Sequence, residues 1–309
     1  MSLVTDVQQF LLFKESEGLA PGTLTTYKWA LALLLEALGN VDTLAKDDGQ
    51  RFMVFVRAHR TARQAPLTNK SIENIWIACR SFDAWRQKEL GQPQWYFVER
   101  PDVSYDQPHP FSADDIKRLL HAATFTATSD THNRKQFTMH RHTAKRDTAM
   151  LLLMLDTGMR AGEVGRLDVG DVDLRTGEIT VDRWGSGKKS KGRMVFVGER
   201  TRKLLLKLCL GRKPDAPLFE TQTDKRLNAS GILHLVHAMG VRAGVKKCHP
   251  HRFRHTFAIQ YLRNGGDVFT LQRFLGHSSL AMVKRYVELS HADDASAHHR
   301  ASPVDAWGL

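Results

Sequence analysis

The sequence predicts a mainly α-helical protein with a small antiparallel β-sheet, organised as an N-terminal helical domain and a larger α+β domain. Apolar residues recur at helical spacing through the first hundred residues. A proline-rich stretch without periodicity at 101–110 follows and is interpreted as a linker. Beyond Arg160, two short segments have strand character, at 177–182 and 193–197. A length of 309 residues is consistent with two domains.

The N-terminal domain, residues 1–100, is expected to hold four helices. In the second, Pro21 stands near the start and Gly39 follows the end, where these residue types are favoured. The fourth carries an apolar stripe that includes Trp76 and Phe82, which is interpreted as core rather than as a binding surface. The expected helices span 4–14, 21–38, 47–60 and 68–90.

The second domain, residues 111–290, is expected to combine helices with one hairpin. The stretch 183–192 has three glycines and three lysines and suits the hairpin tip. The segment 124–146 is rich in Thr, His and Arg without periodicity and is expected to be an exposed basic loop. Helices are expected at 112–120, at 145–155, from 199, from 229, at 254–264, at 267–275, and from Ser278 or Ser279 to 289. A polar tail, 291–309, follows.

The positive charge is concentrated on the second domain. The chain has a net charge of +12. Residues 1–108 carry 12 Lys and Arg against 13 Asp and Glu, whereas residues 109–309 carry 33 against 20. A polyanion bound to the second domain is the favoured explanation, because phosphate neutralisation dominates nucleic-acid affinity. A basic domain without a partner is the alternative.

Composition also bears on the compartment. No run of 18 apolar residues is present, so no membrane span is expected. The first 14 residues lack the pattern of a secretory signal. Three cysteines are scattered without disulfide or metal spacing, which is typical of a reducing cytoplasm. These features predict a cytoplasmic protein, and the polyanion expected on its second domain would associate it with the nucleoid.

Six residues form a pattern that suits phosphodiester cleavage by a tyrosine. Cleavage without a metal requires cations that hold the non-bridging oxygens as negative charge builds up, and arginine is suited to this role. A surface arginine and a packed tyrosine are the ordinary alternatives for single members of the set. The residues are Arg160, Lys188, His251, Arg254, His277 and Tyr286.

The histidines need particular local structure for this role. His251 and Arg254 are three residues apart and share one helical face. His277 and Tyr286 are nine apart and would lie on opposite faces of one helix, so His277 is expected in the turn before the helix. A zinc site built from Cys248, His249, His251 and His255 is an alternative, but the usual metal spacings are absent.

The order and surroundings of these residues resemble the tyrosine recombinase family, the phage-integrase or Xer-type site-specific recombinases. The resemblance is carried by Thr-Gly-Met-Arg at 157–160, His-Arg-Phe-Arg-His-Thr at 251–256 and Leu-Gly-His-Ser-Ser at 275–279. It is dense from about residue 110 to about residue 290. Phe253 stands where the family pattern leads one to expect leucine, and the hairpin before Lys188 is longer than expected.

The resemblance implies a function and a domain assignment. Residues 1–100 would be a core-binding domain and residues 111–290 the catalytic domain. Tyr286 would form a 3′-phosphotyrosyl link, and Lys188 would be the general acid, with Lys189 and Lys191 as rivals. No cofactor or metal is implied. Double-stranded DNA is the implied partner, bound by a tetramer on paired sites. An accessory DNA-bending protein is a further partner that the resemblance allows. A type IB topoisomerase and a catalytically silent DNA-binding regulator are the alternatives.

Overall fold

The computed structural model divides the described residues into two compact units, one up to residue 102 and the other from residue 107 onwards. The structure describes residues 2–62, 64–96, 98–102, 107, 109–127, 129–131, 134–182, 192–277, 279–290, 302, 304 and 307. Each unit is considered separately. In the described part of the chain, no helix has the length and apolar character needed to cross a membrane.

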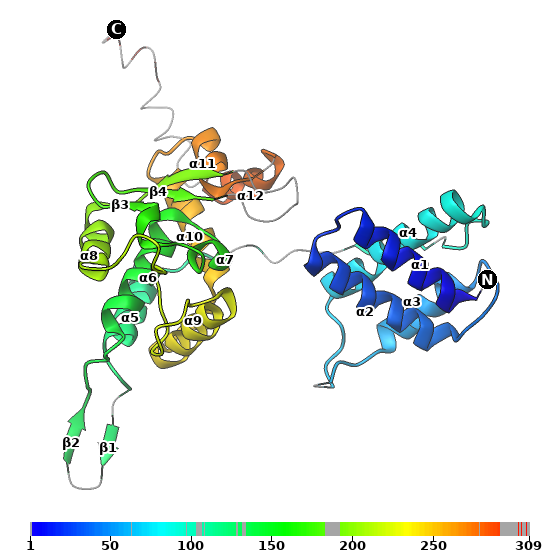
Figure 1. Ribbon diagram of the computed structural model, residues 1–309, viewed down its shortest axis with the longest axis horizontal. Coiled ribbons are helices and arrows are strands. Elements are labelled where there is room, and N and C mark those ends of the chain that lie inside the picture. Colours follow the sequence, from blue (N-terminus) through cyan, green and yellow to red (C-terminus); the bar gives the residue numbers. More distant parts are fainter. Residues whose placement is uncertain are drawn as a thin grey trace. The chain divides into compact units, whose positions relative to one another are not determined.

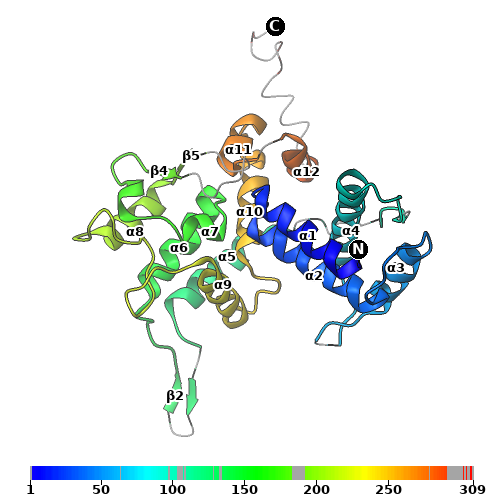
Figure 2. The ribbon, with the colours of Figure 1, turned by 45° about the vertical axis from the view of Figure 1, so that its right-hand side comes forward.

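The first unit is a bundle of four helices (Figures 1 and 2). Ser2 and Thr68 cap the first and fourth helices by accepting hydrogen bonds from backbone N–H groups. The core between the helices is rich in aromatic residues. A buried ion pair between Arg86 Nε and the Asp6 carboxylate, 2.9 Å apart, ties the first helix to the fourth. The helices are α1 (Leu3–Ser16), α2 (Pro21–Leu38), α3 (Asp48–Ala58) and α4 (Asn69–Leu90).

The second unit is built around a buried helix. Helix α6 packs against α5, α8 and α10. Its sequence is apolar around most of its circumference, which suits a central helix. The helices of this unit are α5 (Ala113–Thr124), α6 (Ala144–Thr157), α7 (Ala161–Val164), α8 (Glu199–Cys209), α9 (Ala229–Ala243), α10 (Pro250–Arg263), α11 (Val268–Leu275) and α12 (Ala281–Ser290). The expectation of a mainly helical fold is confirmed.

A three-stranded antiparallel sheet of the second unit has the order β3-β4-β5. The strands are β3 (Val172–Asp173), β4 (Glu178–Val181) and β5 (Arg193–Phe196), and the 3-10 turn Val169–Asp171 precedes β3. Val181 pairs with Arg193 at one end of the β4–β5 ladder. The two predicted strands are therefore present, whereas the predicted hairpin tip lies outside the described residues apart from Gly192.

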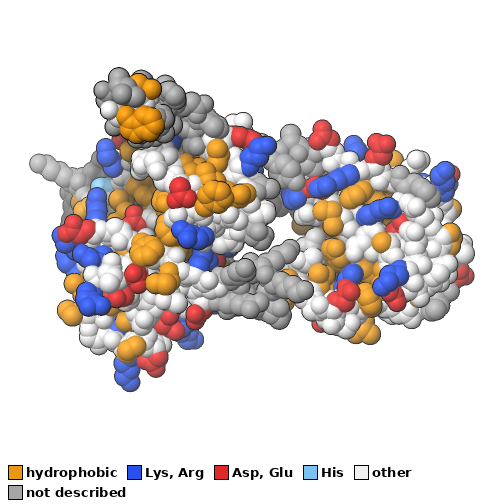
Figure 3. Space-filling model, turned by 90° about the horizontal axis from the view of Figure 1, so that it is seen from above, with side chains coloured by type: hydrophobic (Ala, Val, Ile, Leu, Met, Phe, Trp, Pro, Cys, Tyr) orange, Lys and Arg blue, Asp and Glu red, His pale blue; other side chains and the backbone are white. Residues whose placement is uncertain are grey.

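Charged side chains of both signs share the surface. On the face shown in Figure 3, Lys and Arg side chains lie among Asp and Glu side chains on both units. The described residues on this face therefore do not form one uninterrupted basic patch. The excess positive charge of residues 109–309 is a property of the whole segment rather than of this face.

The segment between α5 and α6 has a structure that differs from the one predicted. The sequence predicted an exposed loop over 124–146, but the segment contains strands β1 (Ser129–Thr131) and β2 (Arg134–Phe137), paired as an antiparallel hairpin (Figure 1). Backbone bonds continue the pairing toward its base, from Thr126 N to Met139 O and from Arg141 N to Thr124 O. The periodicity rule failed here because the apolar and polar residues do not alternate.

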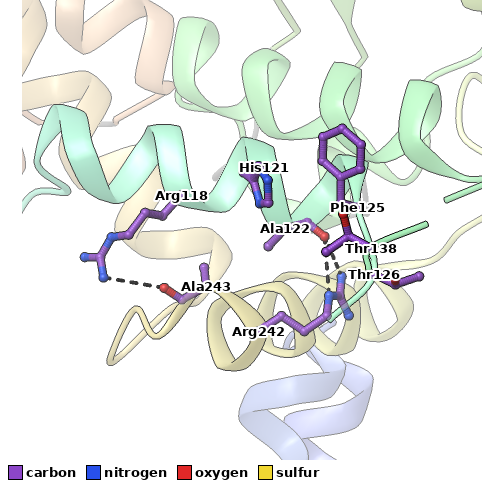
Figure 4. A pocket seen from close by; sticks show the side chains of 8 residues that line it. All are labelled: Arg118, His121, Ala122, Phe125, Thr126, Thr138, Arg242 and Ala243. Atoms are coloured by element: carbon purple, nitrogen blue, oxygen red, sulfur yellow. Dashed lines mark hydrogen bonds between the residues drawn. The ribbon is translucent and has the colours of Figure 1, made fainter. Parts of the chain in front are cut away.

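The helix that precedes this hairpin, α5, is fixed to helix α9. The Arg242 guanidinium donates hydrogen bonds of 3.3 and 3.1 Å to the carbonyl oxygen of Ala122, and Arg118 Nη1 donates to the Ala243 carbonyl at 3.5 Å (Figure 4). Phe125 continues into the hairpin beside a cavity of about 220 Å³. Two arginine side chains therefore join α5 and α9 where the hairpin leaves the body of the unit.

Candidate active site

Helix α10 carries three of the polar residues that meet in the second unit. Pro250 occupies its first turn, where a missing N–H costs nothing, and His249 caps it by accepting from Arg252 N through Nδ1 at 3.2 Å. His251, Arg254 and His255 follow at spacings of three and one. On an α-helix these positions share one side. The cap and the proline therefore determine where α10 begins, and with it the direction in which these three side chains point.

Arg254 is the buried centre of the site. Its side chain is 1% exposed. Nη1 donates to the Gly158 carbonyl at 2.9 Å, and Nη2 donates to the Leu275 carbonyl at 2.6 Å. These carbonyls lie at the C-terminal ends of α6 and α11, where the helix dipoles place partial negative charge. Burial and the nearby Arg160 lower the pKa of Arg254 to about 9, so it remains charged at neutral pH.

Gly158 makes this contact possible. Its φ is +62°, in the left-handed region that ends a helix, and a Cβ atom would lie 2.4 Å from Phe257 Cδ1. The absence of a side chain therefore allows the end of α6 to approach α10 closely. The Gly158 carbonyl reaches the guanidinium as a consequence.

Arg160 and Arg193 share one carboxylate, that of Glu163. Arg160 donates to it from its backbone N at 2.8 Å and from Nη1 at 3.2 Å. Arg193, at the start of β5, makes a bidentate pair at 3.0 and 2.8 Å. Its Nε donates to the Phe274 carbonyl at 2.6 Å. The Arg160 side chain is 45% exposed, so its guanidinium is oriented by the hydrogen bond from Nη1 and is still accessible.

Glu163 is buried, and its ionisation depends on these arginines. Burial acts to raise the pKa of Glu163, but the hydrogen bonds and charge of Arg193, with those of Arg160, outweigh it and lower the pKa to about 2. Arg193 was not identified from the sequence, where it is simply the first residue of a strand. A bidentate pair across 30 residues depends on the strand register, which local spacing does not reveal.

His277 follows α11 in the turn that the sequence predicted. Gly276 ends the helix with φ +63°, and the His277 N–H donates to the Gln272 carbonyl at 3.1 Å. His277 Nε2 lies 2.8 Å from Arg254 Nη2. Arginine is only a donor, so Nε2 is the acceptor and Nδ1 carries the proton of the neutral ring. Nδ1 is buried and has no partner among the described residues. Burial and the charges of Arg254 and Arg160 lower the pKa of His277 to about 3.

Tyr286 lies on α12, inside the same cluster. The side chain is 5% exposed, and its ring stacks on His277 with centroids 6.4 Å apart and planes 11° apart. The hydroxyl lies 2.8 Å from His255 Nδ1. Burial raises the pKa of Tyr286, and the charges of Arg254, Arg285 and Arg160 oppose that rise. The turn at His277 is what brings two residues nine apart together.

The remaining predicted residues differ in their placement. His251 is exposed on α10, and its ring meets that of His255 edge-on, with centroids 4.3 Å apart. Partial burial and the charge of Arg254 lower the pKa of His251. Lys188, with its rivals Lys189 and Lys191, lies outside the described residues. The structure thus brings together Arg160, His251, Arg254, His277 and Tyr286, and adds Glu163, Arg193 and His255.

The zinc alternative can be compared with this geometry. Within the described ranges, no group of three or more His, Cys, Asp or Glu residues is placed to hold a metal ion. The Nδ1 atom of His249 is used in capping α10. Cys248 is buried, and burial raises the pKa of its thiol to about 11.

A family model identifies this part of the chain. The model for the phage integrase family matches residues 111–293, more than half of the sequence. The chain belongs to the phage integrase family. It is a tyrosine recombinase, an enzyme that breaks and rejoins DNA, and the expected family and activity are confirmed.

Individual relatives are similar to this chain over nearly its whole length. The chain is 29% identical over 310 residues to the tyrosine recombinase XerC of Escherichia coli O157:H7 and to that of Shigella flexneri, covering 97% of each sequence. The fold is similar to that of the Tn1549 transposon integrase in complex with circular intermediate DNA, with a TM-score of 0.74 at 16% identity over 97% of this chain and 99% of the other. It is also similar to XerH bound to difH, with a TM-score of 0.67 at 18% identity over 97% and 95%.

The ionisation of Glu163 can be tested through stability. Its pKa in the folded protein lies below its ordinary value, so its stabilising effect is present above about pH 4.5 and is lost as the pH falls toward 2. Glu163→Gln should lower the free energy of unfolding by about 3 kcal/mol at pH 7, from a pKa displaced from 4.5 to about 2. Urea unfolding between pH 7 and pH 2 measures this difference.

The matched control is Glu199→Gln, which removes an exposed carboxylate paired with Lys203 on α8. Exposed pairs contribute little, so this variant should unfold almost like the unmodified protein. The gap between Glu163→Gln and the unmodified protein should close as the pH falls below about 4.5. A gap of constant size at every pH would contradict the ionic role of Glu163.

Proposed function

We propose that Tyr286 is the nucleophile of strand cleavage and that the surrounding cations hold the scissile phosphate. The supporting observation is the placement of the buried Tyr286 hydroxyl in a cluster with Arg254, His277 and His255. The Tyr286 oxygen attacks phosphorus, the bond to the 5′ oxygen breaks, and a 3′-phosphotyrosyl link forms. Its energy is retained, so a 5′-hydroxyl can reverse the step without ATP.

Each basic residue has a separate task in this proposal. Arg160 has an accessible guanidinium oriented by Glu163, and Arg254 has a rigidly held charge, so the two can hold the non-bridging oxygens as charge develops. His277 adds a donor, since its Nδ1 proton has no partner among the described residues. His251, exposed on the same helix, completes the phosphate site. Lys188 protonates the departing 5′ oxygen, with Lys189 and Lys191 as the alternative acids.

The two domains of the proposed enzyme have different tasks: the first binds DNA, and the second carries out catalysis. Residues 1–100 form the core-binding domain, residues 111–290 form the catalytic domain, and residues 101–110 cross the duplex between them. The net positive charge of residues 109–309 favours the polyanion on the catalytic side. We place the enzyme in the cytoplasm, on double-stranded DNA of the nucleoid, with neither cofactor nor metal required.

The nucleophile is tested with a nicked suicide substrate carrying a site selected from random duplexes. Tyr286→Phe should bind the site normally and form no covalent adduct, because phenylalanine has no attacking oxygen. Tyr27→Phe, which removes a hydroxyl from α2 in the other unit, is the control and should form adduct at the normal rate. Denaturing gels measure the adduct. Adduct formed by Tyr286→Phe would exclude this residue as the nucleophile.

The general acid is tested by changing the leaving group. A 5′-bridging phosphorothioate leaves as a thiolate and needs no proton, so it should restore cleavage by Lys188→Ala. It should not restore cleavage by Arg160→Ala, which is expected to be slower by about 10²–10³ because a transition-state donor is lost. Single-turnover rates on the two substrates give the comparison. Rescue of Lys191→Ala or Lys189→Ala in place of Lys188→Ala would transfer the role.

Assembly on paired sites as a tetramer is proposed through the C-terminal tail. Val304 and Trp307 are 53% and 73% exposed, and they stand three residues apart, as on one helical face. We propose that they dock on the catalytic domain of a neighbouring protomer, where α5, α6 and α10 border an apolar cavity of about 520 Å³. A buried tryptophan is a typical anchor of such an interface.

Deletion of residues 301–309 should therefore leave binding to a single site nearly unchanged and reduce cooperative binding to paired sites. Gel-shift titrations on one-site and two-site duplexes measure the two quantities. Trp307→Ala should reproduce most of the loss, whereas Arg300→Ala, outside the deleted segment, should not. Equal cooperativity of the full-length and shortened chains would remove the tail from the assembly.

A further inference from the structure

His255 lies against the proposed nucleophile but has no task in the mechanism above. Its Nδ1 atom is 2.8 Å from the Tyr286 hydroxyl oxygen, and the two ring centroids are 5.6 Å apart. On the other side, the His255 ring meets that of His251, one helical turn earlier. Helix α10 therefore presents an imidazole nitrogen at hydrogen-bond distance from the atom that has to lose a proton.

The protonation states give this hydrogen bond a direction. Burial raises the pKa of Tyr286, so the hydroxyl keeps its proton at neutral pH. Burial and the neighbouring His251, Arg285, His249 and Arg254 lower the pKa of His255 to about 4, so its ring is neutral. A neutral imidazole with its proton on Nε2 leaves Nδ1 as an acceptor. The Tyr286 hydroxyl then donates, and His255 accepts.

The other histidines of the cluster are less suited to accept this proton. His277 Nε2 already accepts from Arg254, so the remaining nitrogen of its neutral ring carries a proton. His251 contacts the His255 ring and is exposed. Among the described residues of the site, His255 combines an acceptor nitrogen with contact to the hydroxyl.

We propose that His255 is the general base of strand cleavage, a proposal that rests on Tyr286 being the nucleophile. As the Tyr286 oxygen bonds to phosphorus, its O–H bond breaks and the proton moves to His255 Nδ1. The bond from phosphorus to the 5′ oxygen breaks, and that oxygen takes a proton from the general acid. In rejoining, the 5′-hydroxyl returns its proton to the general acid as its oxygen bonds to phosphorus, the bond from phosphorus to the Tyr286 oxygen breaks, and that oxygen recovers the proton from His255.

The charges around His255 explain why the step is coupled to DNA binding. The groups that face it are His249, His251 and Arg254 from α10 and Arg285 and Tyr286 from α12. These neighbours make the imidazolium form unfavourable before DNA arrives. A scissile phosphate brings negative charge beside the cluster and favours the imidazolium. His255 thereby becomes a stronger base when there is a phosphate to attack.

The first measurement uses the unmodified protein and the 5′-bridging phosphorothioate substrate, whose leaving group needs no acid. The second-order rate of cleavage at subsaturating DNA reports the ionisation of the DNA-free protein, in which His255 is unprotonated above about pH 4, so this rate should vary little between pH 7 and 9. Direct ionisation of Tyr286 by solvent would instead give a rate that rises about tenfold per pH unit over this range, which lies below the raised pKa of Tyr286. Such a slope in the unmodified protein would overturn the proposal.

The second measurement uses His255→Asn, whose side-chain oxygen can accept the hydrogen bond near the Nδ1 position but cannot carry the proton. This variant should cleave more slowly at pH 7, by on the order of 10²-fold, and the deficit should shrink as the pH rises to 9. His237→Asn, the same change at an exposed position of α9, should cleave normally. Thermal melts and gel shifts with each variant establish folding and DNA binding.

Two results for His255→Asn would reject the general base. An unchanged rate would show that the imidazole is not needed, and a deficit of the same size at every pH would reduce His255 to positioning Tyr286. If His255→Asn fails to fold, the pH profile of the unmodified protein still decides. Failure of the underlying proposal is distinguishable, because Tyr286→Phe would then form adduct or the unmodified protein would form none.

Discussion

The buried charge of Arg254 is the constraint on which the rest of the site depends. A guanidinium removed from water needs compensating negative charge, and the carbonyl groups at the ends of α6 and α11 supply it. Both ends must approach α10 closely, which is why Gly158 has no room for a side chain. One buried cation thus joins α10 to the next helix, α11, and to the end of α6, 96 residues earlier in the sequence, and it places the turn that holds His277.

The sheet is tied to the same turn by a second ionic link. Arg193 on β5 binds the Glu163 carboxylate, which also holds Arg160, and it donates to the Phe274 carbonyl. Phe274 and Leu275 are adjacent, so Arg193 and Arg254 bind successive carbonyls of one helix end. The position of His277 is therefore set by two arginines from different elements, and Arg160 is oriented by the same carboxylate.

The sequence predicted a set of site residues, and those with local spacing are among the ones that the structure brings together. Arg254 follows His251 at helical spacing, and the glycine before His277 indicates the turn that lets it meet Tyr286. Arg193 could not be identified, because its pairing with Glu163 depends on where the tertiary fold places the start of β5 relative to α7. The β1–β2 hairpin was mistaken for a loop because its residues do not alternate in polarity. His255 belongs to the motif at 251–256, but its proposed task depends on where α12 places the Tyr286 hydroxyl. Lys188 remains a prediction.

The hydrogen bonds of the histidine rings distinguish their proposed roles better than the positions of the histidines in the sequence do. All three rings next to Arg254 have lowered pKa values, so the positive charge of the site resides on its arginines. Arg254 occupies Nε2 of His277 and leaves that ring with a donor, which suits a phosphate oxygen. The Tyr286 hydroxyl lies at hydrogen-bond distance from a different ring, that of His255, which we propose accepts its proton. The proposed mechanism needs both kinds of ring, and the hydrogen bond from Arg254 is what leaves His277 as the donor.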